Sequence, residues 1–296
     1  MDKETDVAFV ILNWNGKDFI EACLQSVFAQ TYKKFKVIVV DNGSTDGSVE
    51  LIQKKYPEVQ LIPLNKNLGF GKGMNVGIKK ALEDEEIKYI ILLNYDIKLD
   101  KQFLSEIVKH ANNEKVGICA PKMLRMDNPR IIDSTGHVFS WGRIIDRGYN
   151  KIDNGQYDNR KDIVGACSGA CLYKREMLED IGLFDESYFV YYEDAELSWR
   201  AYNRGWKATF VPTAIVYHGR KSAMKKDKDL AYKLKYLAHR NMITTVIKHG
   251  SGSQKLMFTG WLIKEACLSF VQRILGKVNL RIKFYICGII RIWSSH

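Results

Sequence analysis

Polar side chains end three apolar runs in the first hundred residues. The runs are VAFVILN (7–13), KVIVVD (36–41) and YIILLN (89–94), and their polar ends are Asn13 with Asn15, Asp41 with Asn42, and Asn94 with Asp96. Run ends are often polar only because they meet water, but three in succession with Asn or Asp favour a binding site. Magnesium takes one or two protein carboxylates and completes its shell with phosphates and water. Asp96 is therefore a candidate ligand for a metal shared with a diphosphate substrate.

A second carboxylate pair, Glu193 and Asp194, follows the aromatic run YFVYY (188–192). Aromatic neighbours keep water from a carboxylate and raise its proton affinity, which suits a general base. The alternative is that the two acids cap a helix that begins near Ala195. The two roles are compatible with each other.

The glycine-rich stretch NLGFGKGMN (67–75) offers backbone freedom, a helix start and Lys72. Together these features suit a segment that faces a diphosphate. A stretch of this kind is often only a flexible turn, so it carries little weight alone.

The elements around these residues alternate between strands and helices. The expected strands span 7–13, 36–41, 59–64 and 89–94, and the expected helices lie after Gly16, up to Tyr56, from Gly69 to Ala81 and after Asp100, a candidate cap. Repeated βα units predict an α/β protein with a mostly parallel sheet flanked by helices. In such a sheet the ligand lies beyond the carboxyl ends of the strands, where the polar residues collect.

The next hundred residues are less regular. Residues 121–165 have the composition of a loop-rich insertion, and residues 165–186 form a small-residue stretch that leads into an amphipathic helix. KATFVPTAIVYH (207–218) predicts one or two strands interrupted by Pro212.

Six of these segments and His218 resemble, in order and spacing, the motifs of family 2 inverting glycosyltransferases with the GT-A fold, particularly the rhamnosyltransferase-like branch. The segments are VAFVILNWNG, VVDNGSTDGS, NLGFGKGMNVGI, LLNYDIKLD, SGACLYKREMLEDIGLFDE and FVYYEDAELSWRAYNRGW. The resemblance covers roughly residues 6–222. It implies a GT-A (Rossmann-like) catalytic domain at 1–222, with a nucleotide-sugar half to about residue 100 and an acceptor half at 101–222.

The resemblance also implies roles for individual residues. The residues that it places at the nucleotide sugar are Leu12, Asn13, Asn15, Asp41, Asn67, Gly69, Lys72, Asn75, Asn94 and Tyr95. The residues that it places near the sugar and the acceptor are Ser168, Gly169, Ala170 and Cys171. Asp194 becomes the catalytic base, with Glu193 beside it.

The metal motif falls on Asn94, Tyr95 and Asp96, so the resemblance implies Mg²⁺ or Mn²⁺ at Asp96. His218 either helps to hold the metal or the diphosphate or is only structural. The family's strict motif has an aspartate where this chain has Asn94, whose neutral carbonyl is a weaker ligand. We therefore expect metal binding that depends on the substrate.

The resemblance implies transfer of one sugar, with inversion, from a nucleotide diphosphate sugar such as dTDP-rhamnose or a UDP-sugar. The acceptor is a glycan, either lipid-linked or a polysaccharide. The Q-x-x-R-W motif of processive synthases is absent, and the nearest stretch is Asn203-Arg204-Gly205-Trp206. A non-catalytic carbohydrate-binding or scaffolding relative is the alternative, although both Asp96 and Asp194 are present.

The positive charge of the chain is concentrated near its end. The net charge is +11, and from Arg220 onward 16 Lys and Arg face 3 Asp and Glu. Residues 223–296 predict basic amphipathic helices, with Leu230, Leu234, Leu237 and Ile247 on the earlier ones and Trp261 among the later aromatic residues. Apolar runs are shorter than the roughly 20 residues that span a membrane, so we expect this region to lie on a membrane surface.

There are three alternatives to a membrane surface for this region. The helices could pack on the catalytic domain, form a homodimer interface, or bind nucleic acid. A nucleic-acid-binding function would leave the glycosyltransferase-like motifs unexplained. The polar start MDKETD and six cysteines without a disulfide pattern predict a cytoplasmic protein, peripheral on the inner face of the membrane.

Overall fold

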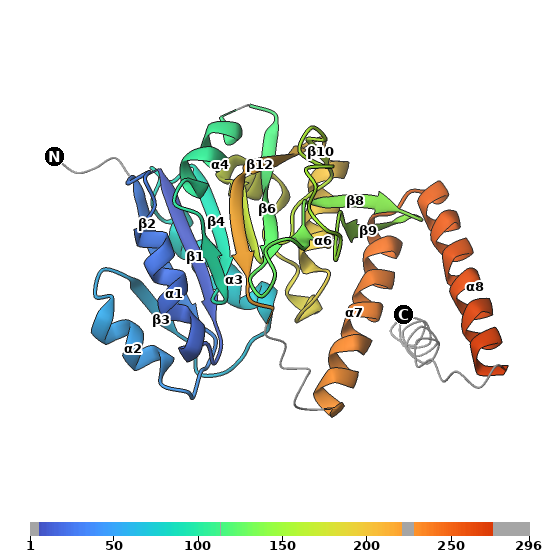
Figure 1. Cartoon of the computed structure of the whole chain (residues 1–296), viewed down its shortest axis with the longest axis horizontal. Coiled ribbons are helices and arrows are strands. Elements are labelled where there is room, and N and C mark those ends of the chain that lie inside the picture. The colour runs from blue at the N-terminus through green and yellow to red at the C-terminus, as the bar shows by residue number, and fades with distance from the viewer. Residues whose placement is uncertain (1–5, 113, 221–227, 275–296) are drawn as a thin grey trace.

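The computed structural model describes residues 6–112, 114–220 and 228–274 (Figure 1). The strands are β1 (Val7–Asn13), β2 (Phe35–Asp41), β3 (Gln60–Pro63), β4 (Tyr89–Asn94), β5 (Ile97–Leu99), β6 (Val116–Arg125), β7 (Ile132–Ser134), β8 (His137–Ser140), β9 (Arg143–Asp146), β10 (Asp162–Ile163), β11 (Ala170–Lys174) and β12 (Lys207–His218). The helices are α1 (Lys17–Phe28), α2 (Ser48–Lys55), α3 (Phe70–Leu82), α4 (Phe103–Ala111), α5 (Arg175–Ile181), the 3₁₀ turn η1 (Glu186–Tyr188), α6 (Glu193–Asn203), α7 (Lys228–His249) and α8 (Gly252–Ile274).

One large mixed sheet forms the centre of the molecule, in the order β10-β12-β6-β11-β4-β1-β2-β3. The strands β4, β1, β2 and β3 run parallel, as do β6 and β12. β11 joins these two groups and is antiparallel to both β4 and β6. The α/β class with a mostly parallel sheet is confirmed, whereas the antiparallel strand β11 was hidden in the small-residue stretch.

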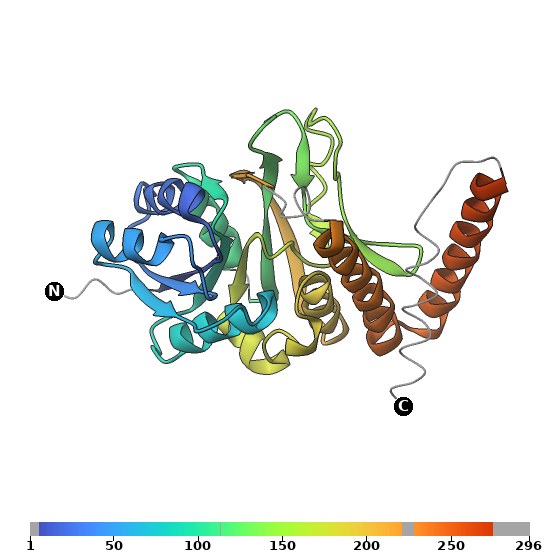
Figure 2. The same cartoon turned by 90° about the horizontal axis from the view of Figure 1, so that it is seen from below.

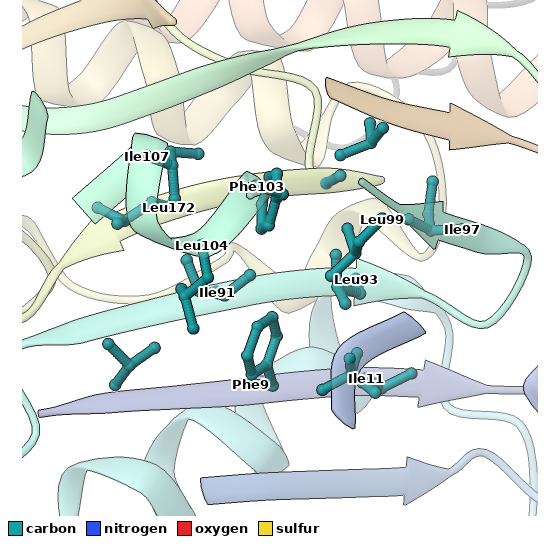
Figure 3. Packing of buried hydrophobic residues seen from close by; sticks show 14 of the residues in the cluster. Phe9, Ile11, Ile91, Leu93, Ile97, Leu99, Phe103, Leu104, Ile107 and Leu172 are labelled. Atoms are coloured by element: carbon teal, nitrogen blue, oxygen red, sulfur yellow. The ribbon is translucent and has the colours of Figure 1, made fainter. Parts of the chain in front are cut away.

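Continuous apolar strands are buried here because helices cover both faces of the sheet (Figure 2). Along β1, Phe9 and Ile11 belong to one core, whereas Ala8 and Val10 belong to the other. Figure 3 shows the first core, in which Phe103 and Leu104 of α4 lie over β4 and β11. This alternation is the expected result of the twofold side-chain period of a strand.

Helix α3 packs unusually close to the sheet because of its glycines. A Cβ atom at Gly77 would lie 2.4 Å from the Val10 side chain and 2.9 Å from that of Val40, and one at Gly73 would lie 2.7 Å from Leu12. The glycine-rich stretch therefore has a packing role in addition to any role at a ligand.

Three expectations about the secondary structure differ from the observed elements. Helix α4 begins at Phe103 with Gln102 at the N-cap, and Asp100 accepts a hydrogen bond from the Gln102 N–H (2.9 Å) before the helix starts. Pro212 does not split its segment: β12 is a single strand whose register shifts between Val211 and Ile215. Residues 121–165 include the second half of β6, the strands β7 and β10 and the hairpin β8–β9, so they are more regular than their composition predicted.

The described C-terminal helices lie beyond the β8–β9 hairpin, at the far end from β3 (Figures 1 and 2). α7 is packed on the preceding α/β domain, because Met242, Ile243 and Val246 share a core with Ala195 and Trp199 of α6. The expected apolar face is only partly correct: Leu237 is buried but Ile247 is 49% exposed.

α8 differs from the expectation at its aromatic residue. Trp261 is buried, with the Arg143 guanidinium 4.0 Å from its ring centre, so it is not an anchor at a surface. Over the part of α8 whose side chains the structure describes, the exposed large apolar residues are Leu256, Met257, Ile263 and Leu268. Among the described residues, no helix has the length and apolar character needed to cross a membrane. Phe270 and the later aromatic side chains lie outside the described ones.

Gly77→Ala is expected to destabilise the protein by about 1–3 kcal/mol, because the added methyl group collides with Val10 and Val40 and outweighs the helix propensity of alanine. Gly260→Ala in α8 is the matched control, because nothing lies within 4 Å of its Cβ position. That change should stabilise the protein by roughly 0.5–1 kcal/mol. Urea unfolding measures both, and equal stability of the two variants would contradict the close packing of α3.

Candidate functional site

Asn13 and Asp41 form the polar end of the first two strands. Asn13 Nδ2 donates to Asp41 Oδ1 (2.7 Å) and to Ser48 Oγ (2.9 Å), and the register of the sheet places the two residues opposite each other. The other Asp41 oxygen accepts from the Ser44 N–H (2.9 Å). Asn13 Oδ1 is buried and has no hydrogen-bond partner among the described residues.

Asn15 and Asn67 shape the loops around this pair. Asn15 has a left-handed backbone (φ 50°), and its side chain accepts from the Thr45 N–H (2.9 Å). Asn67 Oδ1 accepts from the Gly69 N–H (2.8 Å) and from Asn42 Nδ2 (3.1 Å). These contacts hold the β2 and β3 loops together at the carboxyl edge of the sheet.

Other residues expected at the nucleotide sugar have side chains that contact other parts of the chain. The Asn75 side chain donates to the Phe184 carbonyl (2.9 Å) and accepts from the Phe184 N–H (3.1 Å). Lys72 forms an ion pair with Glu186 (3.2 Å), and Leu12 is buried beneath Gly73. These contacts tie α3 to the segment before η1 and to the sheet.

Asp96 and His218 meet where β4 and β12 end. Asp96 is largely buried, and its Oδ1 lies 3.4 Å from His218 Nε2. His218 Nδ1 lies 2.8 Å from Oδ2 of the buried Asp133, whose Oδ1 accepts from Arg220 Nε (2.5 Å). Burial alone would lower the pKa of His218, but hydrogen bonds to Asp133 and Asp96 raise it to about 9. The sequence motifs did not include Asp133, which lies in β7, within the segment that was expected to be rich in loops.

Asp96 and His218 fit a divalent metal shared with a diphosphate. Asp133 holds His218 Nδ1, as carboxylates commonly do for metal-bound histidines, and Nε2 faces the Asp96 carboxylate. No group of three His, Cys, Asp or Glu side chains suited to a metal occurs in the described part of the chain. Two protein ligands leave the other positions to phosphate oxygens and water, as Mg²⁺ prefers.

A backbone hydrogen bond joins the strand that leads to Asp96 with the segment that binds Asp194. The Asn94 N–H donates to the Gly169 carbonyl (2.9 Å), where β4 meets β11. Tyr95 then packs over Gly16, where a Cβ atom would lie 2.5 Å from its ring. Burial raises the pKa of Tyr95 to about 12.

Asp194 lies across this junction, in the first turn of α6. Its Oδ2 accepts from the Ser168 N–H (3.2 Å), and its Oδ1 accepts from the Ala195 N–H (2.8 Å). The helix begins at Glu193 with Tyr192 at the N-cap, so the two acids lie in its first turn and not before it, as the capping alternative had them. The side chains of Ala170 and Cys171, expected near the acceptor, are instead completely buried in the two cores.

Glu193 differs from its neighbour in being almost completely buried. Its Oε2 has no hydrogen-bond partner among the described residues, and burial, followed by the charge of Asp194, raises its pKa well above the ordinary value. A histidine that the sequence did not single out, His137, lies on the other side of Asp194. Its Nε2 is 4.0 Å from Asp194 Oδ2 and 3.6 Å from Asp146 Oδ1.

The five residues before Glu193, Tyr188–Tyr192, have an unusual backbone and are here named the aromatic loop. Phe189, Tyr191 and Tyr192 have φ of 63°, 68° and 67°. Phe189 also has ψ −61°, and the Val190 N–H donates to the Tyr188 carbonyl (2.8 Å), which defines a tight γ-turn. Each such residue costs of order 1–3 kcal/mol, so its surroundings must hold this loop in place.

Asp133→Asn is expected to reduce the free energy of unfolding most at low pH. Because the pKa of His218 is raised from 6.5 to about 9, its charged form stabilises the fold fully below pH 6.5 and loses that effect as the pH rises through 9. The loss should be about 3 kcal/mol at pH 6 and about 1 kcal/mol smaller at pH 9.5.

Urea unfolding at both pH values measures this difference. Asp153→Asn is the control, because Asp153 pairs with Lys122 (3.0 Å), which stays charged across the range. A cost of Asp133→Asn that does not change with pH would contradict the assigned pairing.

Comparison with solved structures places this site in a known fold. The chain is similar to S. aureus TarS 1–349, with a TM-score of 0.61 and 17% identity over 96% of this chain and 79% of that one. It is also similar to the mannosyltransferase PcManGT from Pyrobaculum calidifontis, solved with GDP-Man and Mn²⁺, with a TM-score of 0.61 and 15% identity over 98% of this chain and 88% of that one. The fold is therefore the GT-A fold.

Comparison with curated sequences gives the family. The N-acetylglucosaminyl-diphospho-decaprenol L-rhamnosyltransferase of Mycobacterium tuberculosis is 28% identical over 245 residues, which are 75% of this chain and 79% of that protein. The poly-beta-1,6-N-acetyl-D-glucosamine synthase of Staphylococcus aureus is 27% identical over 73% of this chain, but only 50% of the synthase is covered. The sequence profile of glycosyl transferase family 2 matches residues 8–182, so the chain belongs to that family.

Proposed function

We propose that this protein transfers one sugar, with inversion, from a nucleotide diphosphate sugar to a hydroxyl group of a glycan acceptor. The observation that carries the proposal is the junction of Asn94 with Gly169, which sets Asp96 and His218 on one side and Asp194 on the other. A leaving diphosphate and an attacking hydroxyl need opposite sides of the anomeric carbon. The two groups of side chains suit these two needs.

The donor side consists of the polar loops at the ends of β1 and β2. Asn13 and Asp41 would bind the base and ribose, with Asn15 and Asn67 fixing the loops around them. The similarity to a rhamnosyltransferase supports a deoxysugar donor such as dTDP-rhamnose, with a UDP-sugar as the alternative.

Asp96 and His218 would hold Mg²⁺ or Mn²⁺, with Asp133 fixing the imidazole. The ion, when bound, would neutralise charge that develops on the leaving diphosphate. Asn94 adds no charge to this site, so we expect the metal to bind together with the donor.

Asp194 would act as the general base. The N–H groups of Ser168 and Ala195 each bind one of its oxygens, so the carboxylate is fixed in orientation before the acceptor arrives. As the acceptor oxygen forms its bond to the anomeric carbon, its proton moves to Asp194 and the bond to the diphosphate oxygen breaks with its electron pair. Burial, followed by the charge of Asp194, raises the pKa of Glu193, which disfavours a second negative charge beside the base.

We further propose a lipid-linked or polysaccharide acceptor and a position on the inner face of the cell membrane. The rhamnosyltransferase relative is named for a decaprenol-linked substrate, and α8 presents Leu256, Met257 and Ile263 to solvent beside Lys255 and Lys264. Basic side chains near anionic headgroups contribute roughly 1 kcal/mol each. A homodimer through the same face is the competing arrangement.

Asp194→Asn should lower kcat by about a hundredfold to ten-thousandfold, because the amide cannot accept the hydroxyl proton. Nucleoside diphosphate release measures kcat, and calorimetry with the nucleoside diphosphate measures donor-side affinity, which should not change. Asp180→Asn, a change at an exposed carboxylate paired with Arg204, is the control and should leave kcat unchanged.

An equal loss of nucleotide affinity in Asp194→Asn would count against the assignment of the base. A thermal-shift panel of nucleotide diphosphate sugars, with and without Mg²⁺ or Mn²⁺, identifies the donor. Stabilisation by a donor without any release of nucleoside diphosphate would favour a carbohydrate-binding protein that does not catalyse transfer.

A double change, Leu256→Asp with Ile263→Asp, should weaken binding to vesicles of anionic phospholipid at least tenfold. The two residues are seven apart, so they lie on one face of α8, and each change removes an apolar contact and adds repulsion. Vesicle co-sedimentation measures binding, and Ile247→Asp on α7 is the control. Unchanged binding, with a dimer that dissociates in the double variant, would favour the homodimer.

A further inference from the structure

We propose that Asn241, in the helix α7, is a positioning residue that holds the aromatic loop and thereby sets the place of Asp194. This inference rests on the proposed role of Asp194 as base. Asn241 is 1% exposed and lies about fifty residues beyond the loop in the sequence. No motif of the catalytic domain includes it.

The contact is made by a single amide group. Asn241 Nδ2 lies within hydrogen-bond distance of three carbonyl oxygens of the loop, those of Tyr188 (2.9 Å), Val190 (3.0 Å) and Tyr191 (2.7 Å). An amide nitrogen has two hydrogens, so three carbonyls share two donors. The side chain of no other residue type offers two N–H donors at this length without a charge.

The orientation of the amide is fixed by the preceding residue. Arg240 donates from Nε (2.9 Å) and Nη2 (2.7 Å) to Asn241 Oδ1, and its Nη2 also reaches the Ser187 carbonyl (3.1 Å). Arginine only donates, so the oxygen of the amide must face it and the nitrogen must face the loop. Arg240 therefore directs the two N–H groups of Asn241 toward the loop.

The loop needs such a clamp because its backbone is unfavourable. The Tyr188 carbonyl that Asn241 binds is also the acceptor of the γ-turn centred on Phe189. The next two carbonyls that it binds precede Tyr191 and Tyr192, both with positive φ. All three hydrogen bonds thus fall on the strained turns, and releasing them would let the loop relax to ordinary backbone angles.

Relaxation of the loop would displace both sides of the site. The Phe189 carbonyl accepts from the Phe70 N–H at the start of α3 (2.5 Å), and Tyr192 is the N-cap of the helix that carries Asp194. A second tie between α7 and the loop, from the Tyr188 hydroxyl to Thr245 Oγ1 (2.9 Å), supports the same arrangement. α7 itself is held by the apolar core that it shares with β9, α6 and α8, so it provides a firm base for the clamp.

The test is Asn241→Ala in the full chain. We expect kcat to fall at least tenfold, whereas the Kd for the nucleoside diphosphate stays within about twofold. Hydrogen exchange should become faster in the 187–194 segment and remain unchanged in the 7–13 strand. Asn203→Ala is the matched control. The Asn203 side chain in α6 also donates to a backbone carbonyl, that of His249 in α7 (3.0 Å), but this contact does not involve the loop.

A kcat within twofold of the wild type, or an equal loss in Asn203→Ala, would overturn the proposal. If Asn241→Ala does not fold, Thr245→Val should show the same split between kcat and nucleotide affinity, because it removes the partner of the Tyr188 hydroxyl and keeps the Asn241 side chain. Retained turnover in Asp194→Asn would instead overturn the base assignment. Faster exchange in the 187–194 segment of Asn241→Ala would still establish the clamp as a structural contact.

Discussion

The hydrogen bond between the Asn94 N–H and the Gly169 carbonyl fixes the geometry on which the site depends. Two residues after Asn94 comes Asp96, and one residue before Gly169 the Ser168 N–H binds Asp194. The two acids therefore take their separation from the register of β4 and β11. A slip of one residue would turn Ala170 and Cys171 to the opposite cores and move Ser168 away from Asp194. Burial of the small side chains of β11 keeps this register.

The aromatic loop and α7 fix the position of Asp194, which the sheet cannot fix alone. Strands fix the residues at their ends, but Asp194 lies on a helix that follows a loop with three residues of positive φ. The buried Asn241 and the core around Trp199 connect this helix to α7. α7 therefore contributes to the order of the α/β domain, in addition to any surface that α8 presents.

Much of this arrangement could be predicted from local patterns. The apolar runs of β1, β2 and β4 marked the sheet, and the polar residues at their ends marked its carboxyl edge. The sequence did not predict β11, because this short strand is buried on both faces and lies in a stretch of small residues. Its sequence therefore shows no alternation of apolar and polar residues. Asp133 and Asn241 escaped for a different reason: each binds residues more than 45 positions away, so their roles depend on tertiary contacts. The exposure of Ile247 and burial of Trp261 likewise depend on which neighbours α7 and α8 meet.

The central claim is a single displacement at the anomeric carbon, with Asp194 opposite the leaving diphosphate. NMR spectroscopy of the first product formed, once the donor is known, tests it directly through the coupling constants of the anomeric carbon and proton. We predict a product whose anomeric configuration is opposite to that of the donor sugar. Retention of configuration would contradict this account, because it requires two displacements or a leaving group and acceptor on the same face.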